Sequence, residues 1–367
     1  MSITGKGYYI WKIAQCEGGN VQAIAQTARQ AGLTYVLIKV ANGVSTYNFD
    51  WQHKIDMVPP LVQALKAQGL QAWGWQYVYG NDPLQEADMA IARVTQLGLD
   101  GFIVNAEAEY KQPGKAAAAE TYMKRLRKAL PNTPLGLSSY RFPSYHPQLP
   151  WKEFLTYCDY NMPQVYWMQN HNPAAQLRQT VREFQGRTPM RPLVPTGATF
   201  SEHNWTPAET EVLEFLNTAQ SLNLPAVNFW SWDAARPALP SLWTVVANFP
   251  WGGQPLPEPD IAERFVTALN THDPDKVAAL YHDDAVHVNA VRSVSGKINV
   301  RTWYATLFQQ ILPQATFTLS GYSGAGNSRH LTWEANSTAG TVRTGNDTLG
   351  LRDGKIYYHY TFFKVEP

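Results

Sequence analysis

Short apolar runs alternate with amphipathic stretches from residue 7 to about residue 249. The runs are rich in branched and aromatic residues, as buried strands are, and the stretches carry apolar residues near i, i+3, i+4 and i+7, as helices packed on one face do. Helices are therefore predicted over 21–31, 60–68, 84–97 and 116–130. The predicted strands cover 7–15, 34–41, 71–79, 101–109, 135–140, 161–167, 191–198 and 226–232.

Eight strand and helix units in series favour an α/β fold of the closed (β/α)8 TIM barrel type. Gly32, Gly69 and Gly98 follow three of the predicted helices, at the position where glycine ends a helix at low cost. A doubly wound open sheet is the alternative, but it usually has fewer units and a glycine-rich phosphate loop, which the sequence lacks.

Residues 251–259 interrupt this pattern with three prolines and two glycines, which is typical of a semi-rigid linker. The order of elements then changes to helices at 261–270 and 274–281, a strand at 285–290, a helix at 299–312 and four successive strands. Asp353-Gly354 predicts a type I′ turn in the last hairpin. The sequence thus predicts a barrel over 1–250, a linker over 251–259 and a smaller α+β domain over 260–367.

Residues 99–109 read LDGFIVNAEAE and form the most informative predicted strand. Because strand side chains alternate, Ile103, Asn105, Glu107 and Glu109 share one face, while the residues between them are apolar and suit packing under helices. The first face becomes more polar toward the C-terminal end of the strand, where barrel enzymes place their active sites. This gradient predicts a functional site.

A pair of carboxylates is what glycosidic cleavage requires, because the leaving oxygen needs a proton donor and the anomeric carbon needs a stabilising group. Glu107 and Glu109 are the candidates, with Asn105 beside them. Two non-catalytic interpretations of these glutamates compete with this one. Glu109 could be a solvated loop residue, and Glu107 could be held in a structural salt bridge with Lys39.

The other strand ends carry aromatic and amide side chains, in a chain with 13% aromatic residues. A cleft lined in this way would grip a neutral polymer such as a polysaccharide, although aromatic cores give a similar composition. We expect one of Trp73 and Trp75, and one of Trp230 and Trp232, to face outward under helices. The candidate substrate-binding residues are Trp75, Tyr77, Tyr140, Gln164, Tyr166, Trp230 and Trp232.

Residues 99–107 resemble the active-site signature of glycoside hydrolase family 18, which reads apolar, acid, Gly, apolar, acid, apolar, acid or amide, any residue, Glu. Residues 162–166 and 230–233 resemble its acetamido-binding and sugar-stacking segments, and the lysozyme-like barrels of family 25 also end a strand in an acidic pair. The resemblance implies a glycosidase acting on an N-acetylated polysaccharide of the peptidoglycan or chitin type. Glu107 would be the general acid, Asn105 and Tyr166 would orient an acetamido group, and Trp230 would stack under the bound sugar.

The sequence departs from that signature at Ile103, where the family carries an acidic residue or its amide. The relay of acids behind Glu107 is therefore incomplete. The alternative hypothesis is a carbohydrate-binding or structural module whose barrel has lost catalysis.

Residues 260–367 resemble the SnoaL-like branch of the nuclear transport factor 2 superfamily, a cone of curved sheet wrapped by helices. The resemblance is carried by residues 265–270, 272–275, 280–286 and 351–356. It implies dimerisation or ligand binding through the exposed sheet, or else isomerase or cyclase chemistry on a small molecule, with His287 as a base or as a satisfied core histidine. The candidate pocket residues are His287, Trp303, Tyr304, Trp333, Glu334, Tyr358 and His359.

Charge and composition exclude several other classes. Lys plus Arg total 30 against 29 Asp plus Glu, so no strong field attracts nucleic acid or a membrane surface. Cys16 and Cys158 do not indicate a disulfide framework, no metal or cofactor is expected, and His53, His146, His171 and His203 lie in predicted loops. The N-terminus lacks a secretory pattern, which predicts a cytoplasmic protein or one released by lysis or a phage-type route.

Overall fold

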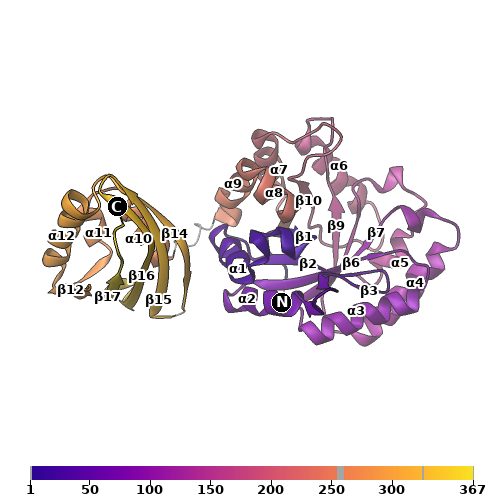
Figure 1. Cartoon of the computed structure of the whole chain (residues 1–367). Coiled ribbons are helices and arrows are strands. Elements are labelled where there is room, and N and C mark those ends of the chain that lie inside the picture. The colour runs from indigo at the N-terminus through magenta and orange to yellow at the C-terminus, as the bar shows by residue number, and fades with distance from the viewer. Residues whose placement is uncertain (1, 254–259, 325, 367) are drawn as a thin grey trace. The chain divides into compact units, whose positions relative to one another are not determined.

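The computed structural model describes residues 2–253, 260–324 and 326–366, and the chain divides into two compact units, Met1–Pro257 and Glu258–Pro367 (Figure 1). In the stretch expected to be a linker, Trp251–Gly253 forms a 3-10 turn. Residues 254–259 lie outside the described residues.

Eight parallel strands of the first unit close on themselves, because β1 pairs with both β2 and β11. The predicted (β/α)8 barrel is confirmed. The short strand β3 (Ser45–Thr46) adds antiparallel to β2, and β4 (Phe49–Asp50) pairs with β5 (Ile55–Asp56) outside the barrel. The barrel strands are β1 (Gly5–Ile10), β2 (Tyr35–Asn42), β6 (Gln71–Val78), β7 (Gly101–Ala106), β8 (Leu135–Tyr140), β9 (Tyr160–Gln164), β10 (Thr196–Ala198) and β11 (Ala226–Trp230).

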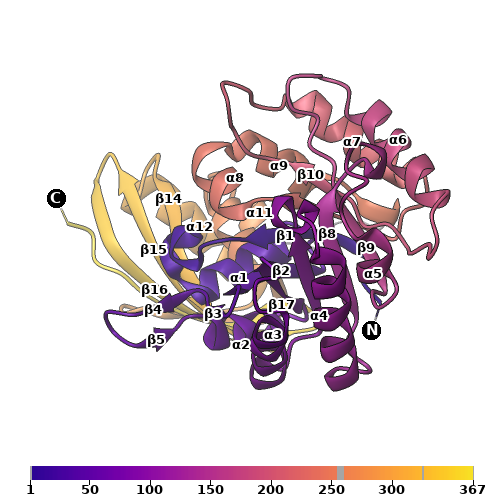
Figure 2. The ribbon, with the colours of Figure 1, turned by 90° about the vertical axis from the view of Figure 1, so that its right-hand side faces the viewer.

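Helices surround this barrel, as the two views show (Figures 1 and 2). Their ends follow local chemistry: the Asn20 side chain caps α1 by accepting from two backbone N–H groups, and Gly98 ends α3 with a left-handed φ of 59°. The helices are α1 (Val21–Gln30), α2 (Val58–Ala67), α3 (Pro83–Leu97), α4 (Lys115–Ala129), α5 (Trp151–Leu155), α6 (Pro173–Gln185), α7 (Glu209–Ser221), α8 (Trp232–Ala238) and α9 (Pro240–Asn248).

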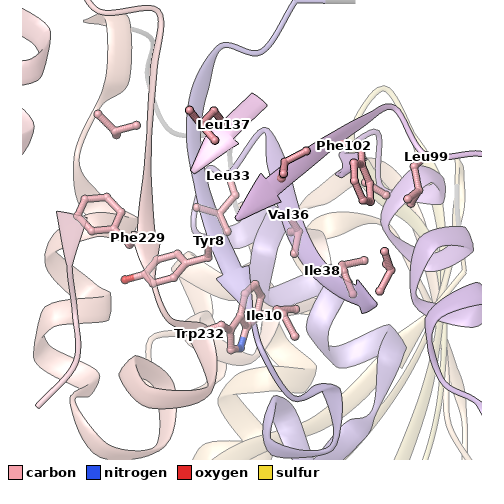
Figure 3. Close-up of a cluster of buried hydrophobic side chains, with 14 of the residues drawn as sticks. Tyr8, Ile10, Leu33, Val36, Ile38, Leu99, Phe102, Leu137, Phe229 and Trp232 are labelled. Atoms are coloured by element: carbon pink, nitrogen blue, oxygen red, sulfur yellow. The ribbon is translucent and has the colours of Figure 1, made fainter. Parts of the chain in front are cut away.

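Two apolar layers pack on opposite faces of the barrel strands. The outer layer, between strands and helices, includes Tyr8, Phe102 and Phe229 (Figure 3). The inner layer fills the barrel, and both Trp73 and Trp75 belong to it. The expectation that one of these tryptophans faces outward was wrong, because residues two apart on a strand share a face.

Several predicted strands are shorter in the structure. The strand expected over 7–15 ends at Ile10 and is followed by a 3-10 turn, η1 (Ile13–Gln15). The strand expected over 191–198 is only Thr196–Ala198, since Pro192 and Pro195 cannot donate to a ladder. The strand expected over 101–109 ends at Ala106, and residues Ala108–Lys111 form the 3-10 turn η3.

The second unit is a six-stranded sheet in the order β13-β12-β17-β16-β15-β14, with three helices and a π-helical turn. Asp353 and Gly354 both adopt positive φ between β16 and β17, as the predicted type I′ turn requires. No helix in the described parts of the chain is long and apolar enough to cross a membrane. The elements are α10 (Ile261–Leu269), α11 (Pro274–Ala278), β12 (Tyr281–Val288), β13 (Ser293–Ser295), α12 (Lys297–Thr306), η6 (Leu307–Ile311), β14 (Thr316–Ser323), β15 (Ser328–Ser337), β16 (Gly340–Arg352) and β17 (Lys355–Phe362).

Candidate functional site

Glu107 lies half-buried at the C-terminal end of β7, immediately after the last strand residue. Its Oε1 accepts hydrogen bonds from Asn105 Nδ2 and Gln164 Nε2, each at 3.0 Å. Asn105 precedes it on the same face of β7, and Gln164 is the last residue of β9. Within the described ranges Oε2 makes no hydrogen bond.

The amide of Gln164 links three strands at this end of the barrel. Besides Glu107, Gln164 Nε2 contacts Asn105 Oδ1 at 3.1 Å and Ser138 Oγ at 3.4 Å. Ser138 is on β8, and sequence analysis missed it. Its position could have revealed it, because strand alternation places Gly136, Ser138 and Tyr140 on one face of β8.

Glu109 reaches the same region from the η3 turn rather than from the strand. Tyr77 Oη donates to Glu109 Oε2 at 2.7 Å. Burial, this hydrogen bond and the charges of Glu107 and Glu109 all raise the pKa of Tyr77. Glu109 thus contacts the Tyr77 hydroxyl group directly, whereas Glu107 acts on it only through its charge.

Lys39 on β2 is only 6% exposed. It lies opposite Trp75 in the register of β2 and β6, and its Nζ lies 4.8 Å from the centre of the Trp75 ring and 4.3 Å from that of Tyr47. Burial lowers the pKa of Lys39 to about 8, while the charge of Glu107 acts in the opposite direction. The alternative of a Glu107–Lys39 salt bridge was wrong, since the described residues form no such ion pair.

Aromatic side chains lie at or just after the C-terminal ends of β8, β9 and β11. Trp230 is half-buried, with its ring centre 5.5 Å from that of Trp75 and 6.1 Å from that of the exposed Trp11. Tyr166 is half-buried against Phe200, and burial raises its pKa well above the ordinary value. Tyr140 is half-buried and stacks on His146 with centroids 3.7 Å apart.

Two predicted substrate-binding tryptophans do not reach the mouth. Trp75 is 2% exposed, and its Nε1 donates to the Ile10 carbonyl inside the barrel. Trp232 is fully buried in the outer layer beside Tyr8 (Figure 3). It begins α8 instead of ending β11, which turns it away from the strand face.

Asp233 was missed as a site residue, although it ends the 230–233 segment singled out in the sequence. Its Oδ1 accepts from the Trp11 backbone N–H at 2.9 Å, and burial raises its pKa. A cavity of about 480 Å³ lies among the loops that follow β1 and β2, and its lining includes Lys12, Tyr47 and Trp51. These loops extend the candidate site beyond the carboxylates.

The cone of the second unit contains a buried polar network. His287 Nδ1 lies 3.1 Å from His359 Nδ1, and His359 Nε2 lies 3.3 Å from Asp347 Oδ2. The Tyr281 hydroxyl lies 2.5 Å from His359 Nδ1 and 2.7 Å from the Tyr304 hydroxyl. Burial and the neighbouring His359 lower the pKa of His287 to about 2, so this imidazole is neutral at ordinary pH.

This network encloses very little space. The cavity it lines measures about 10 Å³ and is also bounded by the predicted residues Trp303, Tyr304 and Trp333. Asp347 and Tyr281 were missed, because the residues joined in this network come from four separate elements. Tyr358 was wrongly placed in the pocket: it is 40% exposed, since it alternates with His359 onto the opposite face of β17.

The comparisons with known proteins concern the second unit. Residues 262–359 match the family model of the SnoaL-like domain. No curated protein matches the chain. The resemblance of the barrel to glycoside hydrolases is not confirmed by these matches.

Similar solved structures cover less than a third of the chain. An NTF2-like protein of unknown function from Mesorhizobium loti is 23% identical over 28% of this chain and 88% of its own, with a TM-score of 0.26. An LEH-like epoxide hydrolase from M. tuberculosis is 20% identical over 28% of this chain and 80% of its own, with a TM-score of 0.25. The second unit therefore contains a SnoaL-like domain, on the evidence of the family match to residues 262–359.

Proposed function

We propose that the barrel hydrolyses an N-acetylated, β-linked polysaccharide of the peptidoglycan or chitin type, with Glu107 as general acid. This proposal rests on the hydrogen bonds that hold the Glu107 carboxyl group. One oxygen is held by the amides of Asn105 and Gln164, and the other is free at the mouth of the barrel. A general acid must be fixed in position and still have an oxygen that can hold the transferable proton.

The proton would pass from Glu107 Oε2 to the leaving glycosidic oxygen. The two amide donors then stabilise the carboxylate that remains. Glu109, fixed by the Tyr77 hydroxyl group, supplies a second negative charge for the positive anomeric centre. Ile103 is fully buried inside the barrel, so amides, rather than the acids of the family 18 signature, support Glu107.

The aromatic residues around the carboxylates fit a neutral polymer. Tyr77, Tyr140, Tyr166 and Trp230 are each half-buried. Sugar C–H faces pack on such rings, and the hydroxyl groups can hydrogen-bond at the same time.

The test is release of reducing ends from peptidoglycan and chitin oligomers by the full chain. We expect Glu107→Gln to lower turnover by about 10²- to 10⁴-fold while binding persists, because the amide keeps the shape of the side chain but carries no transferable proton. Glu120→Gln is the matched control, since Glu120 pairs with Lys124 on the exposed surface of α4. Its activity should equal that of the unmodified chain.

An unmodified chain that is inert on every such polymer would refute the proposal. Retained binding that is indifferent to Glu107→Ala would then favour the alternative, a carbohydrate-binding module. The cone is a weaker candidate for catalysis: small-molecule sites usually enclose about 300–1,000 Å³, whereas the cavity beside His287 measures about 10 Å³.

A further inference from the structure

The cavity among the loops that follow β1 and β2 measures about 480 Å³, which is within the range of about 300–1,000 Å³ that ligand sites usually enclose. Lys12 and Gln15 line it from the segment after β1. Tyr47 lines it from the segment between β3 and β4, and Phe49 and Trp51 line it from the hairpin of β4 and β5. The cavity is therefore large enough for a ligand.

The Asn48 side chain joins the two segments that line this cavity. Its Oδ1 accepts the Ile13 backbone N–H at 2.9 Å, and its Nδ2 donates to the carbonyl oxygens of Trp11 at 3.1 Å and Lys39 at 2.8 Å. Asn48 has a φ of 55°, a left-handed backbone conformation that asparagine adopts more readily than most residues. Hydrogen bonds within the fold thus fix the segments relative to each other.

A tight turn presents the Trp51 side chain at this cavity. Asp50 Oδ1 accepts the backbone N–H groups of Gln52 and His53 at 3.0 and 3.1 Å, and Asp50 Oδ2 lies 2.7 Å from His53 Nδ1. Trp51 is 72% exposed, and its ring centre lies 4.6 Å from that of Phe49. The two rings offer a surface on which an apolar face of a ligand can stack.

The polar groups of the lining favour a neutral ligand with hydroxyl groups, because Lys12 and Asp50 bring opposite charges. Within the residues that the structure describes, the side chains of Lys12 and Gln15 form no hydrogen bond or ion pair. The Asp50 carboxylate has about four acceptor sites, of which the turn uses three. Donors and acceptors beside aromatic rings match a sugar, which has both hydroxyl groups and apolar C–H faces.

Aromatic contacts connect this cavity with the candidate site at the barrel mouth. Tyr47, which lines the cavity, has its ring centre 4.3 Å from Lys39 Nζ on β2. Lys12 Nζ lies 4.7 Å from the ring centre of Trp11, which in turn lies 6.1 Å from that of Trp230. The cavity is thus continuous with a residue that we propose binds the polymer.

We propose that the cavity is a distal subsite for one neutral, N-acetylated sugar unit of the polymer. The Trp51 ring stacks on the sugar, and Lys12 and Gln15 bond its hydroxyl groups. This inference rests on the proposed function for the identity of the polymer. It adds that one polymer chain is held at two connected places, which strengthens the binding of long oligomers.

The experiment is calorimetric titration of the full chain carrying Glu107→Gln, which prevents cleavage during the measurement. The chitin hexamer and peptide-free peptidoglycan strands are titrated separately. We expect Trp51→Ala on this background to raise the Kd of at least one of the two by about tenfold. Lys12→Met, which keeps the length of the side chain but removes its donor, should raise the same Kd by a smaller factor.

Ile55→Ala is the matched control and should leave the Kd unchanged. Ile55 lies on the same hairpin and is 55% exposed, but it is not among the described residues that line the cavity. Because Trp51 is mostly exposed, its replacement by alanine leaves the packed core intact.

Hydrolysis by the unmodified chain separates this inference from the proposed function. With the polymer that binds, Trp51→Ala should raise KM and leave kcat unchanged, because the distal contact is the same before and during cleavage. A chain that cleaves neither polymer, but whose binding Trp51→Ala still weakens, would refute the glycosidase and support the sugar site. Equal affinities with and without Trp51→Ala, or no binding of either polymer, would overturn the inference.

Discussion

Buried nitrogen atoms in this chain differ in whether they find an acceptor. Lys6 Nζ donates to three main-chain carbonyls, while Lys39 Nζ packs against the rings of Tyr47 and Trp75. In the second unit, His287 is fully buried, and its Nε2 has no hydrogen-bond partner in the described part of the chain. The buried His287 imidazole also makes folding depend on pH.

We predict that acid destabilises the second unit through His287. In the folded chain its pKa is lowered to about 2 from 6.5, so between these values the unfolded chain binds the extra proton. Stability is therefore full above pH 6.5 and falls as the pH drops, by at most about 1.4 kcal/mol per pH unit from this residue. Hydrogen exchange of β12 and β17 peptides in the full chain at pH 7 and pH 5 measures this.

His287→Gln should flatten that pH dependence, and the exposed His330→Gln should leave it unchanged. Equal protection of β12 and β17 at both pH values in the unmodified chain would contradict the prediction.

The sequence predicted some site residues and missed others, for physical reasons. Strand alternation was enough to place Asn105 and Glu107 on one face near a strand end. Lys39 was named only as a possible salt-bridge partner of Glu107, and alternation could not reveal the rings around it, which follow β1 and β3 and lie on β6. Networks assembled from distant elements leave no pattern at any one position.

The strand β7 shows how one element serves both folding and the candidate site. Before the strand, Asp100 Oδ2 accepts the Ala72 backbone N–H at 2.9 Å and so ties the start of β7 to β6. A Cβ atom on Gly101 would lie 2.4 Å from the Trp73 ring, so glycine is required for this tryptophan to fill the barrel. The first part of the motif is structural, and only its last residues reach the mouth.

We predict that Gly101→Ala destabilises the barrel by about 1–3 kcal/mol, because the buried Trp73 ring has to move in a close-packed interior. Denaturant unfolding of the full chain, followed by tryptophan fluorescence, measures the change. Gly186→Ala is the control, since its added Cβ would meet nothing closer than 3.9 Å and its φ is −80°. Equal midpoints for the two variants would show that the Trp73 contact is not tight.

The presence of the barrel strands and helices could be predicted from the sequence, whereas the residues at which they end could not. Short apolar runs in the sequence identified the eight barrel strands, because buried parallel strands are nearly continuous apolar runs. The end of β7 was missed since Glu107 adopts φ −132° and ψ −131°, a backbone turn that no preceding glycine or proline announces. That turn sends Glu109 into η3 and still brings it to the Tyr77 hydroxyl group.

At the scale of the whole molecule, the SnoaL-like domain presents an aromatic sheet face. Tyr358, Tyr360 and Phe362 of β17 are 40%, 41% and 50% exposed and lie on one face of the strand. In the sheet register Tyr360 lies between Val288 of β12 and Thr348 of β16, both of which are uncharged. Contiguous apolar surface of this kind usually marks an interface.

We predict that the chain forms a homodimer through this face, because a second copy presents the same uncharged aromatic strip and a two-fold axis lets the strips cover each other. Sedimentation equilibrium should give twice the chain mass. Tyr360→Glu combined with Phe362→Glu should shift the population to monomers, since each dimer would then bury four carboxylates without partners. Ile298→Glu, at a 79% exposed position on α12, is the matched control and should remain dimeric. An unmodified chain that sediments as a monomer at high micromolar concentration would leave this strip exposed for another purpose and refute the dimer.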